Sequence, residues 1–140
     1  MTTSQAESGA TYTASLGVID LPAIVRYAGA SGDFNPMHYD RDLAQEMGFD
    51  TNFAQGMFTA GLMSVVVAER HTPEALLGFG VKFVSPLWCG ETPTFSETVT
   101  DTEPGTIELA LEVRVGDRVV ASGWARVKPR NGPAVAAAVK

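Results

Sequence analysis

The feature that most constrains the fold is a long apolar segment between Gly56 and Arg70, in the middle of the chain. Alanine, leucine, methionine, phenylalanine and valine occupy most of its positions, and it contains no proline. The segment is predicted to be a helix, and a helix that is apolar almost all round is buried on most of its sides. Arg70 and His71 suit its C-terminal end, where the helix dipole favours cations. The rest of the chain must therefore wrap around this helix.

After Leu77 the sequence pattern changes from helical to strand-like. Glu103–Gly105 and Gly116–Asp117 have the composition of short turns between strands. A single buried helix followed by a run of antiparallel strands predicts an α+β fold in which a sheet wraps around the helix. The predicted strands are Gly78–Val84, Thr92–Thr102, Thr106–Val115 and Arg118–Val127.

Before the long helix, the sequence predicts one strand and two shorter helices. Asp20 and Asp40 are typical N-cap residues, and Gly32 and Gly48 are typical residues at helix ends. The segment 31–39 between the two helices is predicted to be a loop, because its proline restricts the backbone. The expected bounds are Thr11–Val18 for the strand, and Leu21–Ala30 and Arg41–Met47 for the helices.

The loop carries the residues best suited to chemistry. It places Asp33 five residues before His38, one of only 2 histidines, with Asn35 and Pro36 forcing a turn between them. If the loop folds against an apolar helix, both groups lose water, and one can take a proton while the other gives one. Asp33 and His38 are therefore the candidate catalytic pair. The alternative is that Asp33 caps the next helix and His38 is an ordinary hydrogen-bonded loop residue. The Asn35 amide is expected to fasten the loop to backbone groups.

Two residues of the long helix are further candidates. Gly56 begins the helix, where N–H groups have no intrahelical acceptor and a carbonyl oxygen would gain both a hydrogen bond and the positive end of the dipole. Ser64 is a hydroxyl in an otherwise apolar stretch. It either holds the Asp33 carboxylate or bonds to a carbonyl of the preceding helical turn. No G-x-S-x-G motif surrounds Ser64, so it is not predicted to be a nucleophile.

The composition excludes several classes of protein. The chain has 140 residues, enough for one domain, and its net charge of -6 argues against nucleic-acid binding. Its first nine residues do not resemble a signal peptide, and its apolar run is too short to span a membrane. The single cysteine, Cys89, excludes an internal disulfide, so a reducing cytoplasm is expected. No metal-ligand cluster or dinucleotide motif is present, so no metal or cofactor is expected.

The expected domain covers residues 10–128, with flexible ends at 1–9 and 129–140. Lysine and arginine are concentrated after residue 112. These cations either contact a phosphate-bearing ligand or simply form a solvated strand face and a basic tail, and the second interpretation is favoured. The candidates for phosphate contacts are Arg126, Lys128 and Arg130.

The segment Gly32-Asp33-Phe34-Asn35-Pro36-Met37-His38, followed by Ala54-Gln55-Gly56-Met57, resembles the MaoC-like, (R)-specific enoyl-CoA hydratase family. The family pattern is G-D-x-N-P-x-H, and later H-G-M at the start of the central helix. The resemblance covers about residues 10–128. It implies a single hotdog fold, in which an antiparallel sheet wraps a long helix, and a dimer with the thioester site near the subunit interface. Gln55 stands where the family often has histidine.

The resemblance also implies roles for individual residues. Asp33 and His38 resemble the catalytic dyad, and Gly56 resembles the residue whose N–H holds the thioester oxygen. Ser64 matches the serine that supports the aspartate, while Gln55 and Met57 match positions that contact substrate. The implied enzyme is a hydro-lyase that needs no cofactor. It adds water to a trans-2-enoyl thioester to form the (R)-3-hydroxyacyl thioester, or catalyses the reverse dehydration.

Three alternatives stay open. The chain could be the catalytic subunit of a heterodimeric dehydratase that acts on 3-hydroxyacyl carrier-protein thioesters. It could be a non-catalytic hotdog subunit that only binds acyl groups, although the presence of all the site residues argues against this. A hotdog thioesterase is less favoured, because the first carboxylate of the long helix is Glu69, at its far end. The substrate is expected to be an acyl-CoA or an acyl-carrier-protein thioester, and the assembly a homodimer or a heterodimer.

Overall fold

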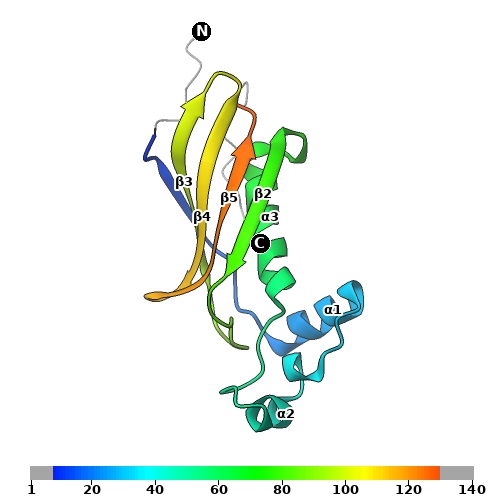
Figure 1. Ribbon diagram of the computed structural model, residues 1–140. Helices are drawn as coiled ribbons and strands as arrows, with labels where there is room; N and C mark the ends of the chain where they lie inside the picture. The colour runs from blue at the N-terminus through cyan, green and yellow to red at the C-terminus, as the bar shows by residue number, and fades with distance from the viewer. Residues whose placement is uncertain (1–7, 130–140) are drawn as a thin grey trace.

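The apolar segment forms helix α3 (Gly56–His71), which lies along one face of a five-stranded antiparallel sheet (Figure 1). This computed structural model describes residues 8–129. The α+β arrangement predicted from the sequence is therefore confirmed. The segments predicted to be flexible, 1–9 and 129–140, fall almost entirely outside the described residues.

The strand order in the sheet is β1-β3-β4-β5-β2. The strand that follows α3, β2, pairs with the last strand, β5, so β1 and β2 are the two edges. β1 is shorter than predicted. The Leu16 N–H still bonds to the carbonyl of Pro93, in register with the ladder, but Pro93 has no N–H to return the bond, and Gly17 then leaves the strand with a φ of 74°. The strands are β1 (Thr11–Ser15), β2 (Leu76–Phe83), β3 (Thr94–Glu103), β4 (Thr106–Val115) and β5 (Arg118–Val127).

The shorter helices gather at the end of the sheet where α3 begins (Figure 1). Their caps are those predicted: Asp20 accepts a hydrogen bond from the Ala23 N–H at 2.8 Å, and Asp40 accepts one from the Leu43 N–H at 3.1 Å. Gly32 ends the first helix with a φ of 77°. The predicted loop contains a single 3-10 turn that the sequence analysis did not anticipate. The elements are α1 (Leu21–Ser31), the turn η1 (Pro36–His38), α2 (Arg41–Glu46) and, after α3, the turn η2 (Pro73–Ala75).

The core lies between α3 and the sheet. Successive side chains of a strand point to opposite faces, so alternate residues of β3 and β4 are buried against the helix. On the helix side, the buried face carries Met63, Val66 and Val67. Burial of this apolar surface is the main favourable contribution to folding. The strand residues in the core are Phe95, Val99, Ile107, Leu109, Leu111, Val113, Val120, Ala121, Ala125 and Val127.

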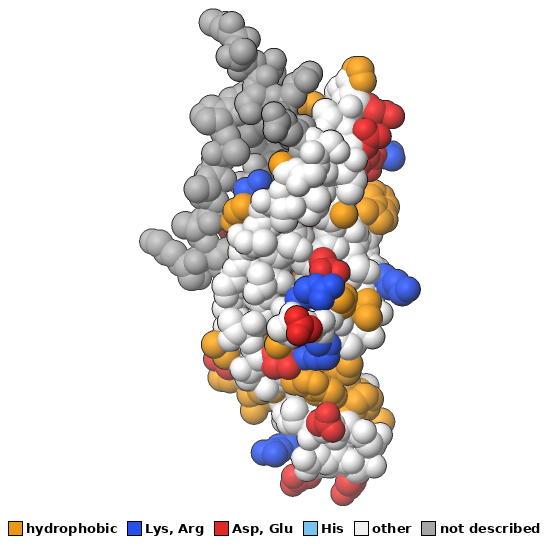
Figure 2. Space-filling view, turned by 90° about the vertical axis from the view of Figure 1, so that its left-hand side faces the viewer, with side chains coloured by type: hydrophobic (Ala, Val, Ile, Leu, Met, Phe, Trp, Pro, Cys, Tyr) orange, Lys and Arg blue, Asp and Glu red, His pale blue; other side chains and the backbone are white. Residues whose placement is uncertain are grey.

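The prediction that α3 is buried on most of its sides is confirmed only in part for the single chain, since most of its residues are buried or half-buried but one side stays open. Met57 is 64% exposed and Val65 is 52% exposed, because one sheet covers only one side of the helix. Val25 of α1 is also exposed. Figure 2 shows hydrophobic side chains gathered low on the molecule, at the end where Figure 1 places α1 and α2. An apolar surface remains open beside the start of α3.

A buried carboxylate fixes the other end of α3. Glu97 of β3 is 3% exposed, and its Oε1 accepts hydrogen bonds from Arg70 Nε at 3.2 Å and His71 Nε2 at 2.8 Å. The Arg70 guanidinium also lies 3.6 Å from the centre of the Tyr12 ring, a cation–π contact. These contacts join the C-terminal end of α3 to β3 and β1.

The pairing of β2 with β5 depends on glycines. A Cβ atom at Gly123 would lie 2.4 Å from the carbonyl oxygen of Gly80, so the strands can approach only if position 123 has no side chain. On the neighbouring strand, a Cβ at Gly80 would lie 2.4 Å from Nε1 of Trp124, whose indole covers the glycine.

We expect Gly123→Ala to lower the free energy of unfolding by about 1–3 kcal/mol, because the new methyl group forces backbone atoms apart. The matched control is Gly29→Ala, on the exposed side of α1, where a Cβ would meet nothing within 4 Å. This change should be neutral or stabilising by up to about 1 kcal/mol. Urea unfolding measures both, and equal effects of the two substitutions would contradict the close approach at Gly123.

Candidate active site

The loop between α1 and α2 places the predicted pair side by side. His38 Nε2 lies 3.7 Å from Asp33 Oδ2. This separation is too long for a direct hydrogen bond, but it leaves the two groups within reach of a shared water or substrate oxygen. His38 is buried, as expected, whereas the Asp33 side chain is 46% exposed, so only one member of the pair loses most of its water in the single chain.

Local hydrogen bonds give the loop its shape. Asn35 caps the 3-10 turn, with its Oδ1 accepting a bond from the Met37 N–H at 3.4 Å, so the predicted role of this amide in fastening the loop is confirmed. Asp33 Oδ1 accepts a bond from the Asn35 N–H at 3.3 Å, while its Oδ2 faces His38. Asp33 does not cap α2, since Asp40 does so. These bonds aim the carboxylate at the imidazole.

The connector before α3 orients His38. The His38 Nδ1 atom lies 2.8 Å from the carbonyl oxygen of Phe53. A carbonyl only accepts, so Nδ1 carries a proton, and in the neutral ring Nε2 has a free lone pair on the side of Asp33. Asn52 donates to the His38 carbonyl at 3.2 Å. The sequence analysis missed Asn52 and Phe53, and the Phe53 acceptor has no sequence signal because any residue supplies a backbone carbonyl.

The N-terminus of α3 lies just after this connector. Gly56 begins the helix, and its N-cap residue, Gln55, makes no side-chain capping bond, in contrast to the aspartates that cap α1 and α2. The Phe58 N–H bonds to the Gln55 carbonyl at 3.0 Å, so the N–H groups of Gly56 and Met57 are the ones available to an acceptor. A Cβ at Gly56 would lie 3.1 Å from the ring of Phe83, so glycine also permits this ring to pack against the helix end.

Two of the other predicted site residues, Gln55 and Ser64, make hydrogen bonds away from the Asp33–His38 pair. Gln55 is 1% exposed, its Nε2 faces the carbonyl of Ile24 at 3.5 Å, and its Oε1 has no partner, so this side chain lies inside the protein and not on an open substrate surface. Met57 is on the surface. Ser64 donates to the Gly61 carbonyl at 2.8 Å, the backbone bond considered as its alternative, rather than to Asp33.

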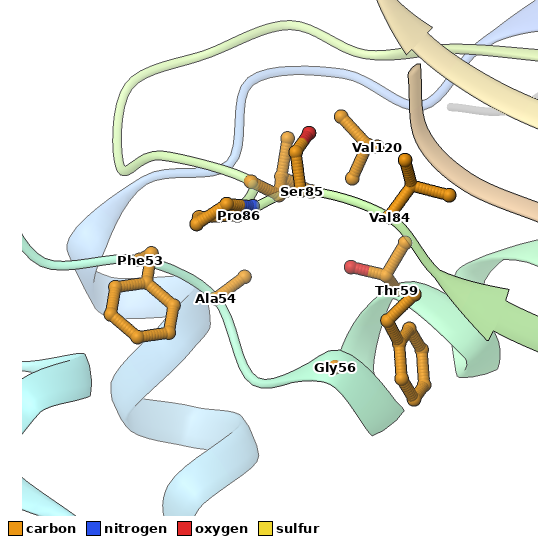
Figure 3. A pocket seen from close by; sticks show the side chains of 10 residues that line it. Phe53, Ala54, Gly56, Thr59, Val84, Ser85, Pro86 and Val120 are labelled. Atoms are coloured by element: carbon orange, nitrogen blue, oxygen red, sulfur yellow. The ribbon is translucent and has the colours of Figure 1, made fainter.

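A pocket of about 300 Å³ lies beside the start of α3, between the connector and the end of β2 (Figure 3). Phe53 belongs both to this pocket and to the His38 site, since its carbonyl accepts the imidazole N–H. Gly56 is also in the lining. The pocket is lined by Phe53, Ala54, Gly56, Thr59, Phe83, Val84, Ser85, Pro86, Leu87 and Val120.

One of the basic residues considered for phosphate contacts already has an acidic partner. Arg126 forms an ion pair with Glu108, and Arg130 lies outside the described residues. Cys89 packs against the core.

Among residues 8–129, no group of three or more histidine, cysteine, aspartate or glutamate side chains is arranged to hold a metal ion. No helix in the same range is long and apolar enough to cross a membrane.

An antiparallel sheet wrapped on a long helix is the hotdog fold, which solved structures of (R)-hydratases share. The family model described as "MaoC like domain" matches residues 5–121. The chain belongs to the MaoC-like dehydratase family.

Known proteins support this assignment. The chain is 36% identical over 108 residues to the (R)-specific enoyl-CoA hydratase of Rhodospirillum rubrum, covering 74% of this chain and 75% of the relative. It is 34% identical over 109 residues to the 3-hydroxybutyryl-CoA dehydratase of Methylorubrum extorquens, covering 75% and 69%. A chain of the ChsH1–ChsH2 complex of Mycobacterium tuberculosis superposes with a TM-score of 0.81 at 26% identity, covering 90% of this chain and 100% of that one. Both named activities are those of hydro-lyases, and so is the activity of this family.

The two histidines should be opposite tautomers when neutral. We expect His38 to carry its proton on Nδ1, facing the Phe53 carbonyl, and His71 to carry it on Nε2, facing Glu97. Long-range ¹H–¹⁵N spectra of imidazole-labelled protein distinguish the two forms, and His71→Gln assigns the signals. A proton on Nε2 of neutral His38 would show that the Phe53 carbonyl does not orient this ring.

Proposed function

We propose that this chain catalyses the (R)-specific hydration of trans-2-enoyl thioesters, or the reverse dehydration of (R)-3-hydroxyacyl thioesters, with Asp33 and His38 as the dyad. The observation that carries the proposal is the distance of 3.7 Å between Asp33 Oδ2 and His38 Nε2. The connector that holds His38 leads directly into the N-terminus of α3, which no side chain caps. The name of the Rhodospirillum rubrum relative supports the same reaction.

The geometry suggests how the atoms would move. A water between Asp33 and His38 adds its oxygen to C3 of the enoyl group, and the dyad delivers a proton to C2 on the same face. Because Nδ1 is held by the Phe53 carbonyl, Nε2 is the ring nitrogen that exchanges a proton with the water or the substrate. The Gly56 N–H stabilises the negative charge that develops on the thioester oxygen.

We also propose that a second hotdog chain, either a copy of this one or a related subunit, covers the open side of α3. Met57 and Val65 are exposed on this helix, and β2 is a free sheet edge. Exposed apolar patches and unpaired edges are typical of surfaces that associate. The complex of two different chains in Mycobacterium tuberculosis provides a precedent for a mixed pair. Such a partner would also shield Asp33, which is half-exposed in the single chain.

The first test is turnover of crotonyl-CoA, the enoyl thioester that corresponds to the 3-hydroxybutyryl-CoA named for one relative. We expect the absorbance of the enoyl thioester to fall with the wild type, and kcat to drop at least about 100-fold in Asp33→Asn and in His38→Ala, since each removes a proton-transfer group. Chromatography on a chiral phase should identify the (R)-3-hydroxybutyryl product.

Matched controls separate the chemistry from folding. Asp42→Asn, on the exposed first turn of α2, and His71→Gln, at the far end of α3, should keep most of the activity per folded molecule. If the wild type is inactive on CoA and carrier-protein thioesters of several chain lengths, alone and with a second hotdog chain, the non-catalytic acyl-binding role replaces this proposal. If the wild type releases free thiol from the thioester, and Asp33→Asn and His38→Ala abolish this release, the protein is a thioesterase instead.

A further inference from the structure

The pocket beside α3 contains one unused polar side chain. Thr59 is 2% exposed, and no hydrogen bond among residues 8–129 involves its hydroxyl. In the same range the fully enclosed side-chain atoms without a partner are Gln55 Oε1 and Glu97 Oε2, so the Thr59 oxygen is reached from the pocket. Figure 3 shows the Thr59 oxygen turned toward the space that the lining residues enclose. A hydroxyl that opens only into a pocket takes its hydrogen-bond partner from whatever fills the pocket, which is water in the free protein and the ligand in a complex.

The second hydroxyl of the pocket is already satisfied. Ser85 donates to the Val119 carbonyl at 2.6 Å and accepts from Arg118 at 2.9 Å. Arg118 also bonds to the Pro86 carbonyl and to the Glu91 carboxylate. This network holds the wall formed by residues 84–87 in place. Thr59 is therefore the free side-chain hydrogen-bonding group in an otherwise apolar, well-supported pocket.

The dimensions of the pocket favour the acyl part of a thioester. Its volume of about 300 Å³ is at the small end of the range for ligand sites, which suits a short acyl group. The pantetheine arm is a poorer match, because its amides need several polar partners and the lining offers one free hydroxyl. At one side, the ring of Phe83 lies against Gly56, so the pocket begins at the helix end that is proposed to hold the thioester oxygen.

We propose that Thr59 is a specificity residue that selects short acyl groups carrying a hydrogen-bonding oxygen near their far end, an inference that rests on the hydratase function proposed above. An acyl group with such an oxygen pairs with the Thr59 hydroxyl. A plain alkyl group of equal length leaves that hydroxyl unpaired when it displaces water from the pocket. Sites built to hydrogen-bond a substrate group discriminate strongly against analogues that lack it.

The test compares trans-2-hexenoyl-CoA with its 6-hydroxy derivative. We expect the wild type to have a kcat/KM about tenfold higher for the hydroxylated substrate, the gain from one hydrogen bond. Thr59→Val, which keeps the shape and removes the hydroxyl, should abolish this preference, while Thr59→Ser should retain it. The matched control is Thr94→Val, at the exposed start of β3, which should behave as the wild type. A wild type without the preference, or a preference that survives in Thr59→Val, overturns the assignment.

Two further measurements keep this test independent of catalysis. The first is the dissociation constant of each thioester, measured by calorimetry with the Asp33→Asn protein. The hydroxylated thioester should bind more tightly than the plain one, and the double variant Asp33→Asn/Thr59→Val should bind the two equally. If the wild type hydrates neither thioester but the binding preference is present, the proposed function fails and the Thr59 assignment stands. Val84→Phe, which narrows the pocket, should weaken hexenoyl binding more than Val18→Phe, an exposed position outside it. Equal effects would show that the acyl group binds elsewhere.

Discussion

The structure depends on the packing of one face of α3 against the sheet. Met63, Val66 and Val67 bury themselves among the inward side chains of β3, β4 and β5, and this contact decides where both ends of the helix lie. One end is held by Glu97 through Arg70 and His71. The other end therefore projects beside the loop of Asp33 and His38, and the candidate site forms where the helix begins.

The site combines rigid and open parts. The His38 ring is buried and held by the Phe53 carbonyl, whereas the Asp33 carboxylate stays half-exposed. The start of α3 is likewise uncapped, although α1 and α2 are capped by aspartates. A preorganised donor and an accessible partner are useful for a reaction in which water must enter between them, because the geometry is set before the substrate binds.

Much of the local structure could be predicted from residues that act over short distances. Asp20 and Asp40 cap the helices that follow them, Gly32 ends α1 and Asn35 fastens its loop. The end of β1 and the 3-10 turn of the loop were not predicted. The strand stops early because the next residue across the ladder, Pro93, has no N–H to bond with Leu16, and no local pattern around Leu16 shows that its partner is a proline.

The sequence by itself determined the α+β fold, the position of α3 and the pairing of Asp33 with His38 on one loop. These follow from apolar periodicity, turn residues and a spacing of five positions, all of which are local. Only the tertiary structure decided that His38 bonds to the Phe53 carbonyl, that Gln55 turns inward, that Ser64 bonds to Gly61 and that Thr59 faces a pocket. These outcomes depend on which side of a helix meets the sheet, and that is settled by the packing of the whole chain.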